Sequence, residues 1–398
     1  MRNYLSHYAG LPISSWQRIG LTFFNDLSGA VVSFLSIYFV QSLHLNIATA
    51  GIIISFYGLG TILGGAISGK LVDHVNPSIV SIVSLLLKAL GYFALIYAKL
   101  PLLLILNVFA VGFGTYGFKT SNNIWLLNNS DENEADKLKT INIIYVAMNL
   151  AFGLSAAIIS SFAKYGFQYL FFFSGVLLLI ACVFLTMQEV NTPTTMHRIK
   201  TENQAQAANE SGKNIKFIYP LLCCVFLYGL MIAQLSATYP VYLESTFPEL
   251  GMKAVGILFV INPILIILLQ APLVNYFGRY NKVSMVGIGI LLYGLGMFLL
   301  PFTSWYFMAI VFCFIYTLGE MLFFANAQLV FYQHGGARRK GRSMGLYQTT
   351  FATGLVVGPA AGGLIYHHFG GDVVWYLCGL IGVASFLLCS YMRKNLEQ

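Results

Sequence analysis

The chain consists of long apolar runs separated by short polar segments. A helix that crosses a bilayer needs about 20 mainly apolar residues, and twelve runs of roughly that length can be placed. Transmembrane β-barrels alternate polar and apolar positions, so runs as continuous as these predict helices. We therefore expect an all-α polytopic membrane protein with spans at 19–41, 47–69, 79–98, 101–127, 140–162, 167–187, 216–240, 254–277, 282–301, 304–332, 344–366 and 373–392.

The longest polar segment divides the twelve spans into two sets of six. Residues 189–215 are dense in Thr, Asn, Gln, Glu and Lys, as linkers are. The run Val-Ser-Ile-Val from Val80, followed by Gly91, has a counterpart in Val-Ser-Met-Val from Val283, followed by Gly294. This indicates duplication and the two-bundle plan of many transporters. We predict an N-terminal six-helix bundle at 1–188, a cytosolic linker at 189–215 and a C-terminal six-helix bundle at 216–398.

The composition supports residence in a membrane. Hydrophobic residues make up 58% of the chain and charged residues only 9%, whereas soluble domains carry about 25% charged residues. This excludes a soluble enzyme, a disordered chain and a nucleic-acid-binding protein, although the net charge is +8.

The distribution of Lys and Arg predicts the orientation. With the N-terminus in the cytosol, seventeen of the 22 Lys and Arg residues, Arg18 among them, lie on the cytosolic side, and only Lys99, Lys164 and Lys253 lie on the other side. The positive-inside rule then predicts that both termini are cytosolic, in a plasma membrane, which in a bacterium is the inner membrane.

Three segments carry recognisable patterns. Residues 69–74 (GKLVDH) keep Gly69 and Asp73 of a G-x-L-a-D-R pattern. Residues 354–363 of the eleventh span fit G-x-x-x-G-P-x-x-G-G at every fixed position. In the tenth span, Gly319-Glu320 is followed by a basic loop at 337–343 and by Met344-Gly345.

These segments resemble the major facilitator superfamily, and most of all its twelve-helix drug:proton antiporters of the MdtH kind. Gly117-Phe118-Lys119, with Asn122, is similar to a motif of the proton-coupled oligopeptide transporters. The resemblance implies transport by alternating access, driven by a proton gradient and without a cofactor. It also implies conformational gating by Gly69, Asp73, Gly354, Gly358, Pro359 and Gly362. For the glycines, close helix packing alone is the alternative.

Four charged residues lie inside predicted spans: Asp26, Lys88, Lys119 and Glu320. A charge in hydrocarbon costs about 2.5–3.5 kcal/mol or more, so each needs a partner or a wet cavity. At about 1.5 Å per residue, Asp26 lies about 12 Å beyond Arg18, and Lys119 lies about 13 Å from the same face. We therefore expect an Asp26–Lys119 pair that couples transport to protons, with a static pair as the alternative.

Glu320 has no basic residue at a similar depth in its half of the chain. An unpaired buried carboxylate exists partly as the neutral acid, which suits a proton carrier or a recognition group for cationic compounds. The alternative is a neutral acid that is hydrogen-bonded within its bundle. For Lys88 we expect a structural role, with its long side chain reaching the interface or an acid.

The substrate site is predicted from polar and aromatic residues in spans that face the central cavity of the superfamily. These candidates are Tyr57, Tyr145, Asn149, Tyr228, Gln234, Asn262, Asn326, Tyr347 and Gln348. Neither the seven His nor the six Cys residues show metal-ligand spacing, so no metal site is expected.

The first functional hypothesis is proton-coupled efflux, or antiport, of drugs or metabolites by a multidrug-type transporter. The alternative is proton-coupled uptake of a peptide, a siderophore or another nutrient. A membrane enzyme or a non-transporting receptor fits the pattern poorly. We expect a small-molecule substrate, a surrounding lipid bilayer, no nucleic-acid partner and a monomer.

Overall fold

The computed structural model describes residues 12–128, 134–191, 215–277, 280–334 and 336–396. The expected lead-in segment before Pro12 and most of the expected linker lie outside these residues. Within the described part, eleven helices are long and apolar enough to cross a membrane, and a bent pair forms a twelfth span if it is counted as one. The predicted all-α polytopic fold is confirmed.

The N-terminal half contains α2 to α8. Their bounds are α2 Ile13–Gly29, the 3-10 turn η1 Ala30–Phe34, α3 Leu35–Ile37, the π-helical turn η2 Tyr38–Ser42, α4 Ile47–Leu71, α5 Pro77–Tyr97, α6 Pro101–Asn128, α7 Glu134–Phe162, the 3-10 turn η3 Ala163–Tyr165 and α8 Phe167–Asn191.

The C-terminal half contains α9 to α15. Their bounds are α9 Ile215–Ile232, the 3-10 turn η4 Ala233–Leu235, α10 Tyr239–Thr246, α11 Met252–Phe277, α12 Lys282–Phe298, the 3-10 turn η5 Leu300–Phe302, α13 Tyr306–His334, α14 Gly336–Phe369 and α15 Gly371–Leu396.

The two repeated segments begin their helices in the same way. Asn76 precedes α5, and its side chain accepts a hydrogen bond from Ser78 N. Asn281 precedes α12, and its side chain accepts from the main-chain nitrogens of Val283 and Ser284. Asn is a favoured N-cap because its side-chain oxygen satisfies a donor that the first helical turn leaves free.

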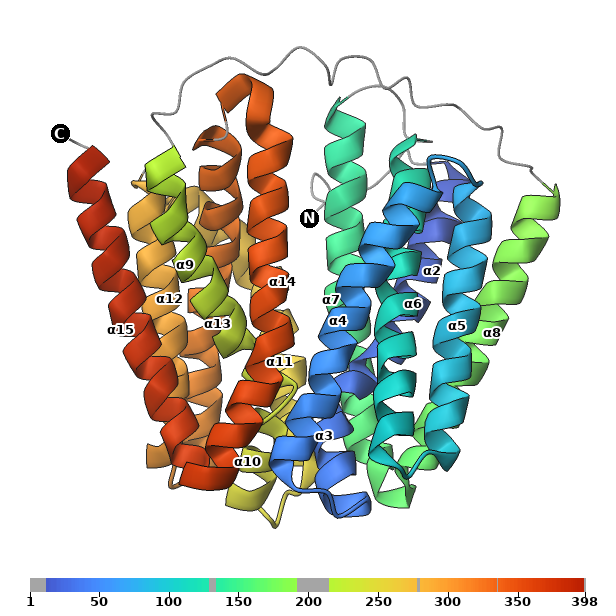
Figure 1. Cartoon of the computed structure of the whole chain (residues 1–398), viewed down its shortest axis with the longest axis horizontal. Helices are drawn as coiled ribbons and strands as arrows, with labels where there is room; N and C mark the ends of the chain where they lie inside the picture. The colour runs from blue at the N-terminus through green and yellow to red at the C-terminus, as the bar shows by residue number, and fades with distance from the viewer. Residues whose placement is uncertain (1–11, 129–133, 192–214, 278–279, 335, 397–398) are drawn as a thin grey trace. The chain divides into compact units, whose positions relative to one another are not determined.

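Contacts divide the chain into two compact units, Met1–Phe34 with Phe56–Lys200, and Leu35–Ser55 with Thr201–Gln398. Within the first unit, α5 packs against α6 and α8, and α2 packs against α7 (Figure 1). Within the second unit, α12 packs against α13 and α15, and α14 packs against α9. The chain thus passes from the first unit to the second within the first span, between η1 and α3, and returns to the first unit within α4.

Glycines allow the closest helix contacts. A Cβ added to Gly319 of α13 would meet Gly289 O of α12 at 2.6 Å, and one added to Gly294 of α12 would meet Cys378 O of α15 at 2.7 Å. Lipid is as apolar as a side chain, so membrane helices associate largely through such close packing of small residues. Large apolar side chains that remain exposed, including Leu90, Ile180 and Leu380, fit a lipid-facing surface.

The first and seventh predicted spans contain breaks in their α-helical geometry that the hydropathy pattern does not show. The first span is α-helical to Gly29 and then passes through 3-10, α and π turns to Ser42. In the seventh span, α9 and α10 meet at a bend of 44°. Pro240 stands in the first turn of α10, where its missing N–H costs no helical hydrogen bond.

The expected basic loop at 337–343 is also corrected, because these residues form the first turns of α14. Their side chains lie outside the described part of the chain.

Candidate functional site

An ion pair joins α2 and α6 in the first unit. Lys119 Nζ lies 2.8 Å from Asp26 Oδ1, and the two side chains are 18% and 10% exposed. The pairing expected from depth along the two spans is therefore present. Lys119 Nζ also lies 5.4 Å from the centroid of the Tyr116 ring, within cation–π range. Tyr57 of α4 is close enough to interact electrostatically with both charges.

A second lysine, on α5, is connected to the same ion pair through Asn25. Lys88 is fully buried, and its Nζ donates to the main-chain oxygen of Asn25 at 2.7 Å and to Asn25 Oδ1 at 2.9 Å. Asn25 Nδ2 in turn donates to Asp26 Oδ1 at 3.3 Å. Asn25 and Tyr116 could not be singled out from the sequence, because neither has a spacing that distinguishes it from other polar or aromatic residues of a span.

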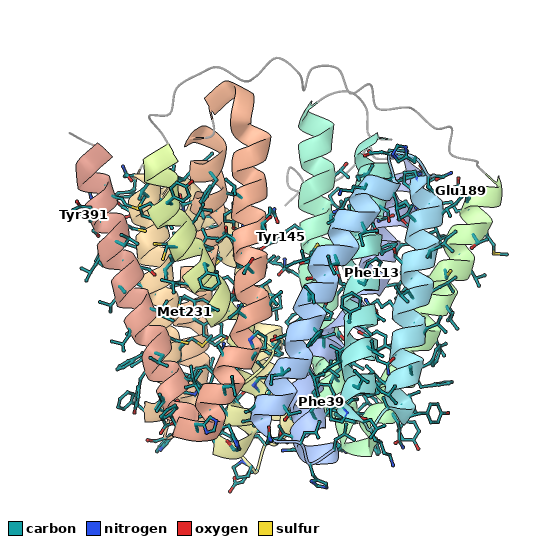
Figure 2. The ribbon with its side chains drawn as sticks, viewed as in Figure 1. Phe39, Phe113, Tyr145, Glu189, Met231 and Tyr391 are labelled. Carbon is teal, nitrogen blue, oxygen red and sulfur yellow. The ribbon has the colours of Figure 1, made fainter. Side chains whose placement is uncertain are left out.

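Arg18 belongs to the charges predicted for the cytosolic side, and its side chain is fully buried. It lies over the Trp125 ring at 4.2 Å. Its Nη2 donates to Ser78 Oγ at 2.6 Å and lies 3.7 Å from Glu189 Oε2. Asn76 Nδ2 donates to the other Glu189 oxygen at 2.7 Å. Figure 2 shows Glu189 near the C-terminal end of α8, so this network ties α2, α5, α6 and α8 together.

Glu320 lies in the second unit with a polar partner from a neighbouring helix. Asn262 Nδ2 of α11 donates to Glu320 Oε2 at 3.0 Å and to Thr317 Oγ1 at 2.9 Å. Among the described residues, no basic side chain forms a salt bridge with Glu320. The predicted site residues Asn262 and Glu320 are thus brought together, and Thr317 joins them.

Tyr228 and Tyr347 belong to one buried aromatic cluster in the second unit. The Tyr228 ring centroid lies 3.7 Å from that of Phe323 and 5.0 Å from that of Tyr293. Tyr228 and Tyr347 both stack on Phe351, at 6.3 and 6.5 Å. Tyr228 and Tyr347 are 0% and 2% exposed, so in this structure they contribute to packing.

Gln234 connects the break in the seventh span to the glycine motif of α14. Its Nε2 donates to Gly358 O at 2.9 Å, and Thr238 Oγ1 donates to its Oε1 at 2.9 Å. A Cβ on Gly362 would collide with Gln234 Oε1, and one on Gly354 would lie 2.8 Å from Gly229 Cα. The motif residues therefore allow α14 to lie directly against α9 and η4.

The same motif contacts the start of α4, which belongs to the second unit. A Cβ on Gly51 would collide with Pro359 O, and one on Gly363 would lie 3.3 Å from Gly51 Cα. Ala360 N, next to the proline, donates to Ser55 Oγ at 3.1 Å.

Two of the other predicted substrate residues make contacts within their own helices. Asn149 Nδ2 donates to Tyr145 O on its own helix, and Asn326 Nδ2 donates to Leu322 O in the same way. Tyr145, labelled on α7 in Figure 2, is 42% exposed, and Gln348 is exposed on α14.

Gly69 and Asp73 lie at the end of α4 and in the turn after it. Asp73 is exposed. A Cβ on Gly69 would meet Thr120 Cγ2 at 3.7 Å, which is ordinary van der Waals contact. Their gating roles stay predictions. Within the described residues, no group of three or more His, Cys, Asp or Glu side chains could hold a metal ion.

The fold and its buried charges define a polytopic helical membrane protein. The chain belongs to the Major Facilitator Superfamily, whose family model matches residues 19–354 and 251–397. This confirms the family predicted from the sequence motifs.

Two relatives come from Bacillus subtilis (strain 168). The protein described as uncharacterized MFS-type transporter YqjV is 23% identical over 401 residues, which cover 97% of this chain and 95% of that protein. Uncharacterized MFS-type transporter YttB is 25% identical over 361 residues and covers 87% of each chain.

Solved transporters share the fold. A POT family transporter in complex with 5-aminolevulinic acid has a TM-score of 0.81 at 14% identity, over 98% of both chains. The nucleoside transporter NupG has a TM-score of 0.79 at 14% identity, over 96% of this chain and 99% of that one. At sequence identity this low, the similarity shows only that the fold is shared. The family match and the transporter relatives identify the chain as a multi-pass membrane transporter rather than an enzyme.

Proposed function

We propose that the chain is a proton-coupled secondary transporter that exports a small organic solute across the plasma membrane by alternating access. In this proposal both termini lie in the cytosol, as the distribution of Lys and Arg favours.

The buried Asp26–Lys119 ion pair is the observation that carries the proposal. The two side chains are only 18% and 10% exposed, and a pair so largely withdrawn from water is held by the charge on each partner. A proton on Asp26 removes the negative charge, and Lys119 is then free to separate from it. Proton uptake thereby becomes a change in the contacts between α2 and α6, which is what coupling requires.

Glu320 supplies a second carboxylate in the other unit. Its polar partner among the described residues is the Asn262 amide, and no positive charge among these residues stabilises the ionised Glu320 carboxylate. We propose that Glu320 carries a proton in the absence of a cationic solute and pairs with the solute when one is bound.

Uptake by proton symport is the second candidate. The observation that favours it is the position of Lys119 within Gly117-Phe118-Lys119, which is similar to a peptide-transporter motif. The fold shared with POT family transporters agrees with this candidate but does not distinguish it from export.

Vesicles of opposite orientation test the direction. Methyl viologen serves as the export probe and radiolabelled alanyl-alanine as the uptake probe, under an imposed pH gradient with an acidic extracytoplasmic side. Export predicts that methyl viologen accumulates in inside-out vesicles with an acidic lumen. Accumulation of alanyl-alanine in right-side-out vesicles under an inward proton gradient would instead establish uptake.

Glu320→Gln tests the proposed recognition of cations. The substitution keeps the shape and removes the charge, so transport of methyl viologen should fall more than transport of neutral chloramphenicol. An equal loss for both probes would show that Glu320 does not recognise the solute's charge.

A further inference from the structure

Lys88 has no part in the function proposed above, although it is fully buried beside the ion pair. Its helix lies directly against α6, because a Cβ on Gly114 of α6 would lie 2.7 Å from Lys88 Cβ and 2.8 Å from Lys88 N. On the α2 side, Gly29 leaves room for the amine, since a Cβ there would lie 3.6 Å from Lys88 Nζ. The side chain is thus confined and aimed at one residue, Asn25.

The contacts of Lys88 determine the orientation of the Asn25 amide. Both oxygens that face Lys88 Nζ are acceptors, so Nζ is the donor in each contact. An amide flip would point Nδ2 at Nζ and place two donors against each other. Lys88 therefore holds Asn25 Oδ1 on its own side and leaves Nδ2 to face Asp26.

The two oxygens of Asp26 are unequal as a result. Oδ1 accepts from Lys119 Nζ at 2.8 Å and from Asn25 Nδ2 at 3.3 Å. Oδ2 is buried and has no hydrogen-bond partner among the described residues. A carboxylate with one oxygen engaged by two donors accepts a proton on the other oxygen, where the lone pairs are free.

We propose that Lys88 is a positioning residue that acts through Asn25 to fix Asp26, so that Oδ2 is the atom that takes up the proton. The inference rests on the proposed function, because it assumes that Asp26 is protonated during transport. The role is one of orientation, and Lys88 itself contacts neither solute nor the transferred proton.

The test follows Asp26 directly and needs no solute. The full chain is placed in lipid nanodiscs, and the infrared band of the protonated carboxyl group is titrated with pH. Asp26→Asn identifies the band by removing it. Lys88→Met removes the donor, and Asn25→Ala removes the amide bridge but leaves the main-chain oxygen that Lys88 also binds. Tyr92→Phe is the matched control, since Tyr92 lies one turn further along α5 and donates to Ser28 O at 2.8 Å without reaching Asp26.

We expect Lys88→Met and Asn25→Ala each to displace the midpoint of the Asp26 band by about one pH unit or more, as the loss of a hydrogen bond to a carboxylate does. Lys88→Met also removes a positive charge near Asp26, so its effect is measured in the Asn25→Ala background as well. There it should shift the midpoint less than it does in the intact chain, because the amide bridge is already absent. Tyr92→Phe should leave the midpoint in place.

The results that would contradict the inference can be told apart from those that would contradict the proposed function. If Asp26→Asn removes no band at any pH, Asp26 takes up no proton and the proposed function fails with the inference. If the band exists but neither Lys88→Met nor Asn25→Ala moves it, only the positioning role is overturned. A shift of equal size in Tyr92→Phe would also overturn it, because it would reflect general loosening of the contact between α5 and α2. Should Lys88→Met fail to fold, Lys88→Gln takes its place, since it also removes the ammonium group, and an unmoved midpoint there would overturn the positioning role.

Discussion

The contact between α9 and α14 gives a prediction whose size follows from the structure. A Cβ added to Gly354 would lie 2.7 Å from Phe226 O and 2.8 Å from Gly229 Cα. Both neighbours are main-chain atoms, so no side-chain rotation relieves the overlap. Non-bonded carbon atoms prefer about 3.5–4.0 Å, and the two helices must therefore separate by roughly 1 Å in Gly354→Ala.

The free energy of unfolding should fall as a consequence. Overpacking of a close contact costs about 1–3 kcal/mol, while Ala in place of Gly favours a helix by about 0.5–1 kcal/mol. The difference between these ranges is a net loss of up to about 2.5 kcal/mol, centred at about 1 kcal/mol, which is a factor of roughly 5 in the ratio of folded to unfolded protein. Gly20→Ala in α2 is the control, because a Cβ there has nothing within 4 Å. It should stabilise the protein by about 0.5–1 kcal/mol.

The assay is unfolding of the purified chain in one detergent, by heat and by titration with sodium dodecyl sulfate. The midpoint of Gly354→Ala should lie below that of the intact chain, and the midpoint of Gly20→Ala should lie at or above it. If both variants unfold at the same midpoint, the close approach of α9 and α14 is refuted as the reason for the glycine at position 354.

Three further results are expected. Glu189→Ala removes the carboxylate that faces the buried Arg18 guanidinium and should lower the free energy of unfolding by at least about 1 kcal/mol in the same assay. Glu189→Gln should recover part of this loss. An unchanged midpoint would show that the pair contributes nothing. Asn281→Ala removes the N-cap of α12 and should cost about 0.5–2 kcal/mol, and a loss below that range would contradict the capping role. Asn262→Ala removes the hydrogen-bond partner of Glu320 and should impair methyl viologen transport without lowering the amount of folded protein; full transport would exclude a role for this amide.

The sequence was sufficient for the spans and for the Asp26–Lys119 ion pair. Apolar runs fix which residues cross the membrane, and the rise per residue fixes how deep a charge lies. Two opposite charges at similar depth in hydrocarbon lower each other's cost of burial by pairing, so depth predicted the pair.

The partners of Arg18 and Lys88 could not be predicted in this way. Depth does not give the rotation of a helix about its axis, and that rotation decides whether Arg18 faces solvent or the Trp125 ring. The Lys88–Asn25 contact runs partly to a main-chain oxygen, which has no counterpart in the pattern of residue types.

The breaks in the first and seventh spans could not be predicted from the sequence either. Within apolar runs, α, 3-10 and π turns satisfy the same hydropathy pattern, because all three bury their main-chain hydrogen bonds. In the seventh span, Thr238 donates to Gln234 across the break, and Gln234 donates to Gly358 O of α14. The second contact could not be predicted without the position of a distant helix.

The central claim, that Asp26 couples movement of the solute to movement of protons in the opposite direction, is tested most directly by measuring both fluxes in one preparation. The purified chain is reconstituted into liposomes that contain a trapped pH indicator, and methyl viologen is added outside without an imposed pH gradient. Proton-coupled antiport predicts that entry of methyl viologen makes the lumen alkaline, and that Asp26→Asn abolishes the pH change. Entry of methyl viologen without a pH change, or an undiminished pH change in Asp26→Asn, would contradict the account.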